Sequence, residues 1–138
     1  DGTFFIPKNK VDEKYIFTAY HNENTLHGLT TLDLLITQRH ILGIETFTNP
    51  LQYLAADVNN DQKVTALDLV HMRKIILGIE THYRDNTSWI FLDEASMKVE
   101  TNPWLIKKYI SIPEGHMNLD HVRFVALKVG DVDGVPKN

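Results

Sequence analysis

One segment of this chain occurs twice, and that repeat constrains the fold more than any other feature. Residues 30–46 recur as residues 65–81, and ten of the seventeen aligned positions are identical. Each copy starts with a threonine, has an aspartate three residues later, and reaches a glycine near its end. A hydroxyl residue before an acidic first turn favours a helix start, and glycine favours a left-handed helix end. The repeat therefore predicts two equivalent units, each built around one helix.

Both predicted helices are short, and each has one apolar side at helical spacing. A helix of about three turns is marginal in water alone, so we expect the two to pack on each other. Between the copies, Asn49-Pro50 predicts a turn before a short helix around residues 51–54. The apolar residues assigned to the packed sides are Leu32, Leu35 and Ile36 in the first copy and Leu67, Val70 and Ile75 in the second.

The flanking segments have the composition of strands. Residues 15–20 are rich in aromatic and β-branched side chains, and residues 3–6 are the expected partner strand. Further candidate strands are residues 88–92, 109–112 and 122–129. The predicted fold class is α+β, with two repeated loop–helix units flanked by strands on both sides. The expected divisions are a strand pair at 1–20, the helical repeat pair at 21–83 and a small β-rich extension at 84–138.

Oxygen-bearing side chains occupy positions 1, 3, 5, 9 and 12 of the segment 57–68, which runs into the second helix. Calcium takes six to eight oxygen ligands, and alternate residues of a tight loop can direct oxygens at one centre. The spacing therefore predicts a twelve-residue calcium loop, although an Asn/Asp-rich turn that caps a helix is the simpler alternative. The expected ligands are Asp57, Asn59, Asp61, the backbone carbonyl of Lys63 and Asp68, with Thr65 acting through a water.

Two positions of this loop depart from the usual pattern. Gln62 stands where glycine is usual, so the turn there should be strained. Asp68 is shorter than the usual glutamate, so the helix must approach the ion more closely. The loop carries three carboxylates, which suggests moderate affinity.

The first copy keeps few of these ligands. Counting back from Asp33 puts Asn22 and Asn24 at positions 1 and 3, but Leu26 falls at position 5 and cannot bind a metal. A weak second site at Asn22, Asn24 and Asp33 is the most that this loop predicts. Near the end of the chain, Asp131-Val132-Asp133-Gly134 resembles the start of another calcium loop. It is either a plain turn or a source of carboxylates for the incomplete first site or for a second ion.

Composition argues against several other functions. The chain has no cysteine, which excludes disulfides and thiolate metal sites, and its net charge of -4 leaves no basic stripe for nucleic acid. No apolar run is long enough for a membrane span. The seven histidines lack the paired spacing of zinc hydrolases. Trp89 and Trp104 are expected in the core rather than in a sugar site, and we expect no catalysis.

The two units, each a calcium-type loop followed by a helix that ends in Leu-Gly, resemble a type I dockerin module over residues 22–80. The resemblance implies an F-hand fold that binds Ca²⁺ and docks onto cohesin domains through its helices. It places partner-reading positions on Ala66, Leu67, Arg73 and Lys74, and on Thr31, Leu32, Gln38 and Arg39. The charged candidates for partner binding are Arg39, Arg73 and Lys74.

The wider layout is similar to dockerin-like regions of large secreted Bacteroidota surface proteins, in which a prealbumin-like β-domain precedes the dockerin unit. Residues 1–20 would then be the last strands of that domain. The chain begins with Asp1, so we expect a processed product or a fragment. The expected function is calcium-dependent protein docking in a secreted or cell-surface protein. The alternatives are a structural module that packs in cis to stiffen an adhesin or filament, and an accessory region of a carbohydrate-active enzyme.

Overall fold

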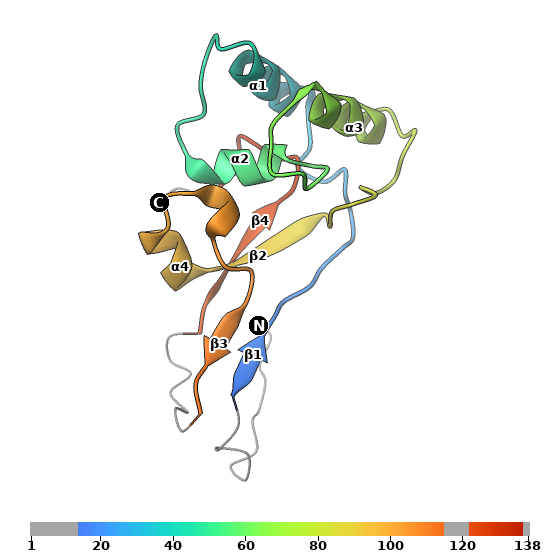
Figure 1. The fold of residues 1–138 in the computed structure, drawn as a ribbon. Helices are drawn as coiled ribbons and strands as arrows, with labels where there is room; N and C mark the ends of the chain where they lie inside the picture. The colour runs from blue at the N-terminus through green and yellow to red at the C-terminus, as the bar shows by residue number, and fades with distance from the viewer. Residues whose placement is uncertain (1–13, 115–121, 137–138) are drawn as a thin grey trace.

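The computed structural model describes residues 14–114 and 122–136, and Figure 1 shows their arrangement. Two helices lie side by side at one end, a shorter helix lies beneath them, and two pairs of strands extend away. This order confirms the α+β class with helical units flanked by strands. The elements are β1 (Tyr15–Phe17), α1 (Thr31–Ile41), α2 (Pro50–Ala56), α3 (Ala66–Ile76), β2 (Trp89–Asp93), α4 (Glu94–Val99), the 3₁₀ helix η2 (Pro103–Leu105), β3 (Ile110–Ile112) and β4 (Phe124–Lys128).

The two repeats fold as equivalent helices, α1 and α3. In each, the threonine before the helix and the aspartate at its third position satisfy each other's backbone amides, forming a capping box. In both helices the C-cap residue is a leucine, and the next residue, Gly43 or Gly78, has a φ of 68°. Only glycine adopts that conformation without a steric cost. The predicted caps and the short helix after Asn49 are therefore confirmed.

The buried sides of α1 and α3 differ from the prediction. Leu32 and Leu67 are 48% and 51% exposed, and Leu35 and Val70 are similarly exposed. The residues that are fully enclosed are Asp33 and Thr37 in α1 and Asp68, Met72 and Ile75 in α3. The first-turn aspartate must point inward to close its loop, and this orientation fixes the rest of each helix. Leu32, Leu35, Leu67 and Val70 are thereby turned toward solvent, and the assignment of these four residues to the core was wrong.

The strands form two antiparallel pairs. β1 pairs with β3, with Ile16 opposite Ser111, and β2 pairs with β4, with Phe91 opposite Ala126. The described partner of β1 is thus a strand of the C-terminal extension. The predicted partner of β1, residues 3–6, lies outside the described residues. Two elements of the extension, α4 and η2, were not predicted; Asp93 and Asn102 cap them.

One hydrophobic core joins the helical repeats to the C-terminal extension. It contains Leu51 of α2, Met72 of α3, Leu92 of β2 and Leu127 of β4, each at most 1% exposed. After β4 the chain returns to the helices, where the Gly130 amide donates to the carbonyl of Ala55 at 2.8 Å. The extension is therefore part of the same folded body as the repeats. None of the helices in the described part of the chain has the length and apolar character that a membrane crossing requires.

Lys128 is buried at the junction between the β-strands and the first repeat. Its Nζ donates to the carbonyls of Thr25 and Ser88, at 2.9 and 3.2 Å, and lies 5.7 Å from the ring centre of Trp89. Burial lowers the pKa of Lys128 to about 8, and the negative charge of Asp131 partly opposes this effect.

This burial predicts a rise in stability at alkaline pH. Between the pKa of folded Lys128, about 8, and its unfolded value of 10.5, the unfolded chain binds more protons at this residue. The free energy of unfolding should therefore increase with pH, by up to about 1.4 kcal/mol for each pH unit. Urea unfolding across this range, compared with Lys128→Met, measures the effect. If the free energy of unfolding changed with pH by the same amount in the two proteins, the prediction would be contradicted.

Candidate metal centres

In the loop between α2 and α3, backbone amides donate hydrogen bonds to the loop's own side chains. Asp57 Oδ1 and Oδ2 accept from the amides of Asp61 and Gln62 at 3.0 and 2.8 Å. Asn59 Oδ1 accepts from the Asp61 amide, and Asp61 Oδ1 accepts from the Lys63 amide. The acidic and amide side chains at positions 1, 3 and 5 are thereby bound to the backbone of their own loop, where Asp57 is buried, Asn59 is half-buried and Asp61 is exposed.

Asp68 closes the loop from the first turn of α3. Its Oδ1 accepts from the amides of Val58 and Asn59, at 3.0 and 3.4 Å, and its Oδ2 accepts from the Thr65 amide at 2.8 Å. The side chain is fully buried. The start of the loop, its end and the helix are thus held together by one carboxylate.

The electrostatics of this loop favour a cation. Burial raises the pKa of both Asp57 and Asp68, and backbone hydrogen bonds partly oppose the effect. The charge of Asp61 raises both pKa values further, and Asp57 raises that of Asp68. The donor set consists of three carboxylates and the Asn59 amide oxygen, all hard oxygen ligands of the kind that calcium prefers. The residues therefore fit a calcium ion.

The loop also stores backbone strain. Gln62 and Asn60 have φ values of 64° and 58°, in the left-handed region that glycine occupies at little cost. The expected strain at Gln62 is confirmed. A strained turn kept in place by carboxylates is typical of a segment that holds a ligand.

The C-terminal extension supports this loop. Trp104 of η2 donates from Nε1 to Asp57 Oδ2 at 3.2 Å, and Asn86 Nδ2 donates to the Asp57 carbonyl at 3.0 Å. Trp104 also packs edge-on against Tyr53 of α2. The sequence offered no signal for these contacts, because the residues lie 29 and 47 positions beyond Asp57.

Replacing Trp104 by phenylalanine should weaken the loop. The change keeps an aromatic ring against Tyr53 but removes the donor to Asp57, a hydrogen bond to a charged group that contributes about 1.5–3 kcal/mol when well enclosed. Trp104 is only partly buried, so we expect a loss of about 1 kcal/mol in the free energy of unfolding in chelator. Chemical denaturation measures it. Unchanged stability would show that the Trp104–Asp57 contact contributes nothing.

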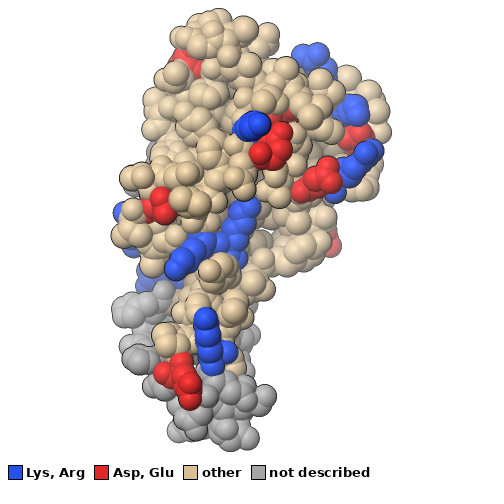
Figure 2. Space-filling view, viewed as in Figure 1, with Lys and Arg blue, Asp and Glu red and all other residues tan. Residues whose placement is uncertain are grey.

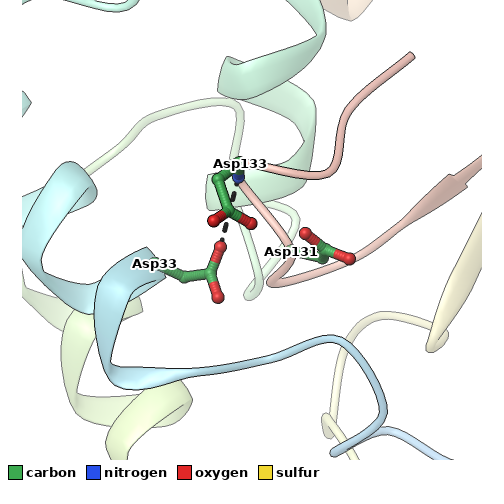
Figure 3. Close-up of side chains that lie close together, drawn as sticks. All are labelled: Asp33, Asp131 and Asp133. Atoms are coloured by element: carbon green, nitrogen blue, oxygen red, sulfur yellow. Dashed lines mark hydrogen bonds between the residues drawn. The ribbon is translucent and has the colours of Figure 1, made fainter.

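The first repeat has a different arrangement, and Figure 3 shows Asp33 facing Asp131 and Asp133. Asp33 is fully buried and its Oδ2 accepts from the Thr30 amide, as in the second repeat. Its Oδ1 accepts from the amides of Val132 and Asp133, at 2.6 and 3.2 Å, which belong to the segment after β4. Asp33, Asp131 and Asp133 each offer a carboxylate oxygen, and these oxygens lie within 4.8 Å of one another. Three residues from distant parts of the chain thus form a group that could hold a metal ion.

The other residues predicted for a weak first site have separate roles in the structure. Asn22 Oδ1 accepts from the Ser88 amide at 2.9 Å, so this side chain links the repeat to the start of β2. Asn24 has a φ of 52° and its carbonyl accepts from the amide of His27, which forms a turn. Their part in metal binding stays a prediction.

The charged residues predicted to bind a partner lie in the last turns of α1 and α3. Arg39 and Lys74 occupy equivalent repeat positions and form ion pairs with Glu45 and Glu80, at 3.3 and 2.9 Å. Arg73 is exposed. On the face drawn in Figure 2, basic and acidic groups are interspersed, and no single charge covers it.

These features describe two copies of a loop and helix, and in the second copy the oxygen-bearing side chains at the predicted ligand positions belong to a single loop. Residues 29–77 match the family model of the dockerin type I domain. The match contains both helices and the 57–68 loop. Dockerin domains are non-catalytic, calcium-binding modules that dock onto cohesin partners, and they occur in secreted or cell-surface proteins. No curated protein and no solved structure matches the chain.

Proposed function

We propose that this chain is a calcium-stabilised docking module of a secreted or cell-surface protein, and that its helices present the surface that a cohesin-like partner binds. The observation that carries the proposal is the 57–68 loop, in which the donor set, the buried carboxylates and the following helix agree with the dockerin match. The ligands are Asp57, Asn59, Asp61, the carbonyl of Lys63 and Asp68, with Thr65 acting through a water.

The ion's role is to hold the loop in the form that positions α3. Asp68 stands at the start of α3 and Asp57 at the end of α2, so an ion between them fixes the angle at which one helix follows the other. Because binding stabilises only the folded loop, the energy of binding is also energy of folding. Calcium would therefore set the shape of the surface formed by α1 and α3.

The exposed sides of α1 and α3 support docking as the function. Leucine or valine occupies equivalent exposed positions in both repeats, and the upper part of Figure 2, where these helices lie, has wide uncharged areas. Exposed apolar side chains gathered on neighbouring helices are typical of protein interfaces. These residues are Leu32, Leu35, Leu42 and Ile44 in the first repeat and Leu67, Val70, Leu77 and Ile79 in the second.

Binding to a panel of immobilised cohesin domains, measured in calcium and in chelator, tests this proposal. We expect one or more cohesins to bind in calcium and to lose at least tenfold in affinity with Leu35→Asp/Val70→Asp. Val99→Asp is the matched control, because Val99 is 82% exposed on α4, away from the two helices. No binding to any cohesin, or equal losses for the two variants, would count against docking through this surface.

A further inference from the structure

We propose that the chain binds a second calcium ion in a loop assembled from two separate segments, residues 28–33 and 131–135. This inference rests on calcium being the ion of the 57–68 loop. It assigns a role to Asp131 and Asp133. The first repeat has no carboxylate at positions 1, 3 and 5 of its own loop, and these two aspartates would supply carboxylates in their place.

The first argument is the equivalence of the two closing aspartates. Asp33 and Asp68 occupy the same repeat position, and each binds two consecutive backbone amides through Oδ1. For Asp68 these amides belong to positions 2 and 3 of its loop. For Asp33 they belong to Val132 and Asp133, so these residues take positions 2 and 3, and Asp131 takes position 1. Residues 131–133 thus stand where residues 57–59 stand in the second repeat.

Burial and side-chain chemistry follow the same equivalence. Val132 and Val58, the two residues at position 2, are 0% and 1% exposed. Position 1 is an aspartate in both loops, and position 3 is Asp133 in one and Asn59 in the other, both oxygen donors. The assembled loop therefore has three carboxylates, from Asp33, Asp131 and Asp133, which is the number in the 57–68 loop.

Gly28 completes the arrangement from the other segment. It stands at position 7, where a calcium loop supplies a backbone carbonyl. The carboxylate of Asp131 lies so close that a Cβ on Gly28 would be 2.5 Å from Asp131 Oδ2, and Gly28 has a φ of +82°. A residue with a side chain would separate the carboxylate from this stretch of backbone, so glycine permits the two halves of the loop to meet.

A buried hydroxyl without a partner in the described part of the chain lies close to this group of aspartates. Tyr83 is 3% exposed, and its hydroxyl has no hydrogen-bond partner among the described residues. The hydroxyl lies beside Gly130, the residue before Asp131, where a Cβ would be 2.5 Å from it. Burial raises the pKa of Tyr83, and the nearby charge of Asp33 raises it further. Calcium commonly keeps water among its ligands, and a water on the ion is a partner that this hydroxyl lacks.

Hydrogen bonds on both sides of residues 131–135 fix this segment beside the start of α1. The Gly130 amide is bound to Ala55, and Asn49 Nδ2 donates to the carbonyl of Pro136 at 2.9 Å. The charge of Asp131 raises the pKa of Lys128, whose ammonium group donates to the backbone carbonyls of Thr25 and Ser88. An ion here would join the end of the chain to the start of α1, so that the repeat pair depends on the extension for its first calcium site.

Counting bound calcium ions by native mass spectrometry tests the split site. We expect two ions on the unaltered chain and on Asp85→Asn, an exposed control with the same loss of charge per residue. Asp131→Asn/Asp133→Asn should bind one ion, and Asp57→Asn/Asp61→Asn should also bind one. One ion on the unaltered chain, lost only with Asp57→Asn/Asp61→Asn, would overturn the split site and leave the proposed function intact. No ion on any protein would contradict both.

A second measurement does not depend on how the Asp131 and Asp133 variant folds. In Asp57→Asn/Asp61→Asn, where the 57–68 loop is disabled, added calcium should still shift the backbone amide resonances of Gly28, Val132, Asp133 and Gly134 in a two-dimensional nitrogen–proton NMR spectrum. Resonances at these four residues that stay unchanged at millimolar calcium would overturn the proposal.

Discussion

Transfer of this protein from calcium to chelator is expected to lower its melting temperature by on the order of 10 °C. An ion present at one hundred times its dissociation constant stabilises the folded state by about 2.7 kcal/mol. In a domain of this size each kcal/mol shifts the melting temperature by roughly 3–4 °C. Asp57 and Asp68 are at most 3% exposed and repel each other, so the chain without an ion keeps two buried carboxylates in an unfavourable arrangement.

The double variant Asp57→Ala/Asp68→Ala provides the comparison for this experiment. It should melt at the same temperature in calcium and in chelator if the 57–68 loop holds the only ion, and should keep a smaller calcium response if the split site is also present. Asp85→Ala, at an exposed position, should respond to calcium like the unaltered chain. A melting temperature of the unaltered chain that is independent of calcium would contradict the prediction.

Leu127→Ala is expected to destabilise the helical repeats as much as the strands. Leu127 is 1% exposed in β4 and belongs to the core that includes Leu51 and Met72. Truncating a buried leucine costs about 2–5 kcal/mol, depending on how far the cavity collapses. Since the core is shared, we expect a single unfolding transition whose urea midpoint is lower than that of the unaltered chain. Circular dichroism of the helices and tryptophan fluorescence should give the same midpoint.

The control for this change is Leu105→Ala, which removes the same atoms from a side chain that is 63% exposed. Its effect should stay within about 0.5 kcal/mol. Two separate transitions, with the helical signal unaffected by Leu127→Ala, would show that the repeats and the extension fold independently. That result would support the division at residue 84 as a true domain boundary.

The local features of this fold were readable from the sequence, because each has a short-range cause. Thr30 and Thr65 cap helices through aspartates three residues later, and Gly43 and Gly78 end them. The spacing of ligands in residues 57–68 depends only on the turn geometry of one loop. For the same reason the strain at Gln62 was predictable from the residue type alone.

The long-range features could not be read in this way. Periodicity identifies an apolar side of α1 and α3 but cannot show that the buried aspartates turn Leu32 and Leu67 outward. The contact of Trp104 with Asp57 and the pairing of β1 with β3 join residues far apart in the chain. The motif Asp131-Val132-Asp133-Gly134 did give a signal, since it matches the start of a calcium loop. Its position beside Asp33 required the fold.

The most direct test of the account is a calcium titration of the purified chain by isothermal calorimetry, beside Asp57→Asn/Asp61→Asn. The predicted result is that calcium binds the unaltered chain and that at least one site is lost in the variant, because burial and the charge of Asp61 raise the pKa of both Asp57 and Asp68, and a bound cation would offset both effects. Identical titrations for the two proteins would mean that residues 57–68 form a plain helix-capping turn, and the calcium-dependent docking function would lose its foundation.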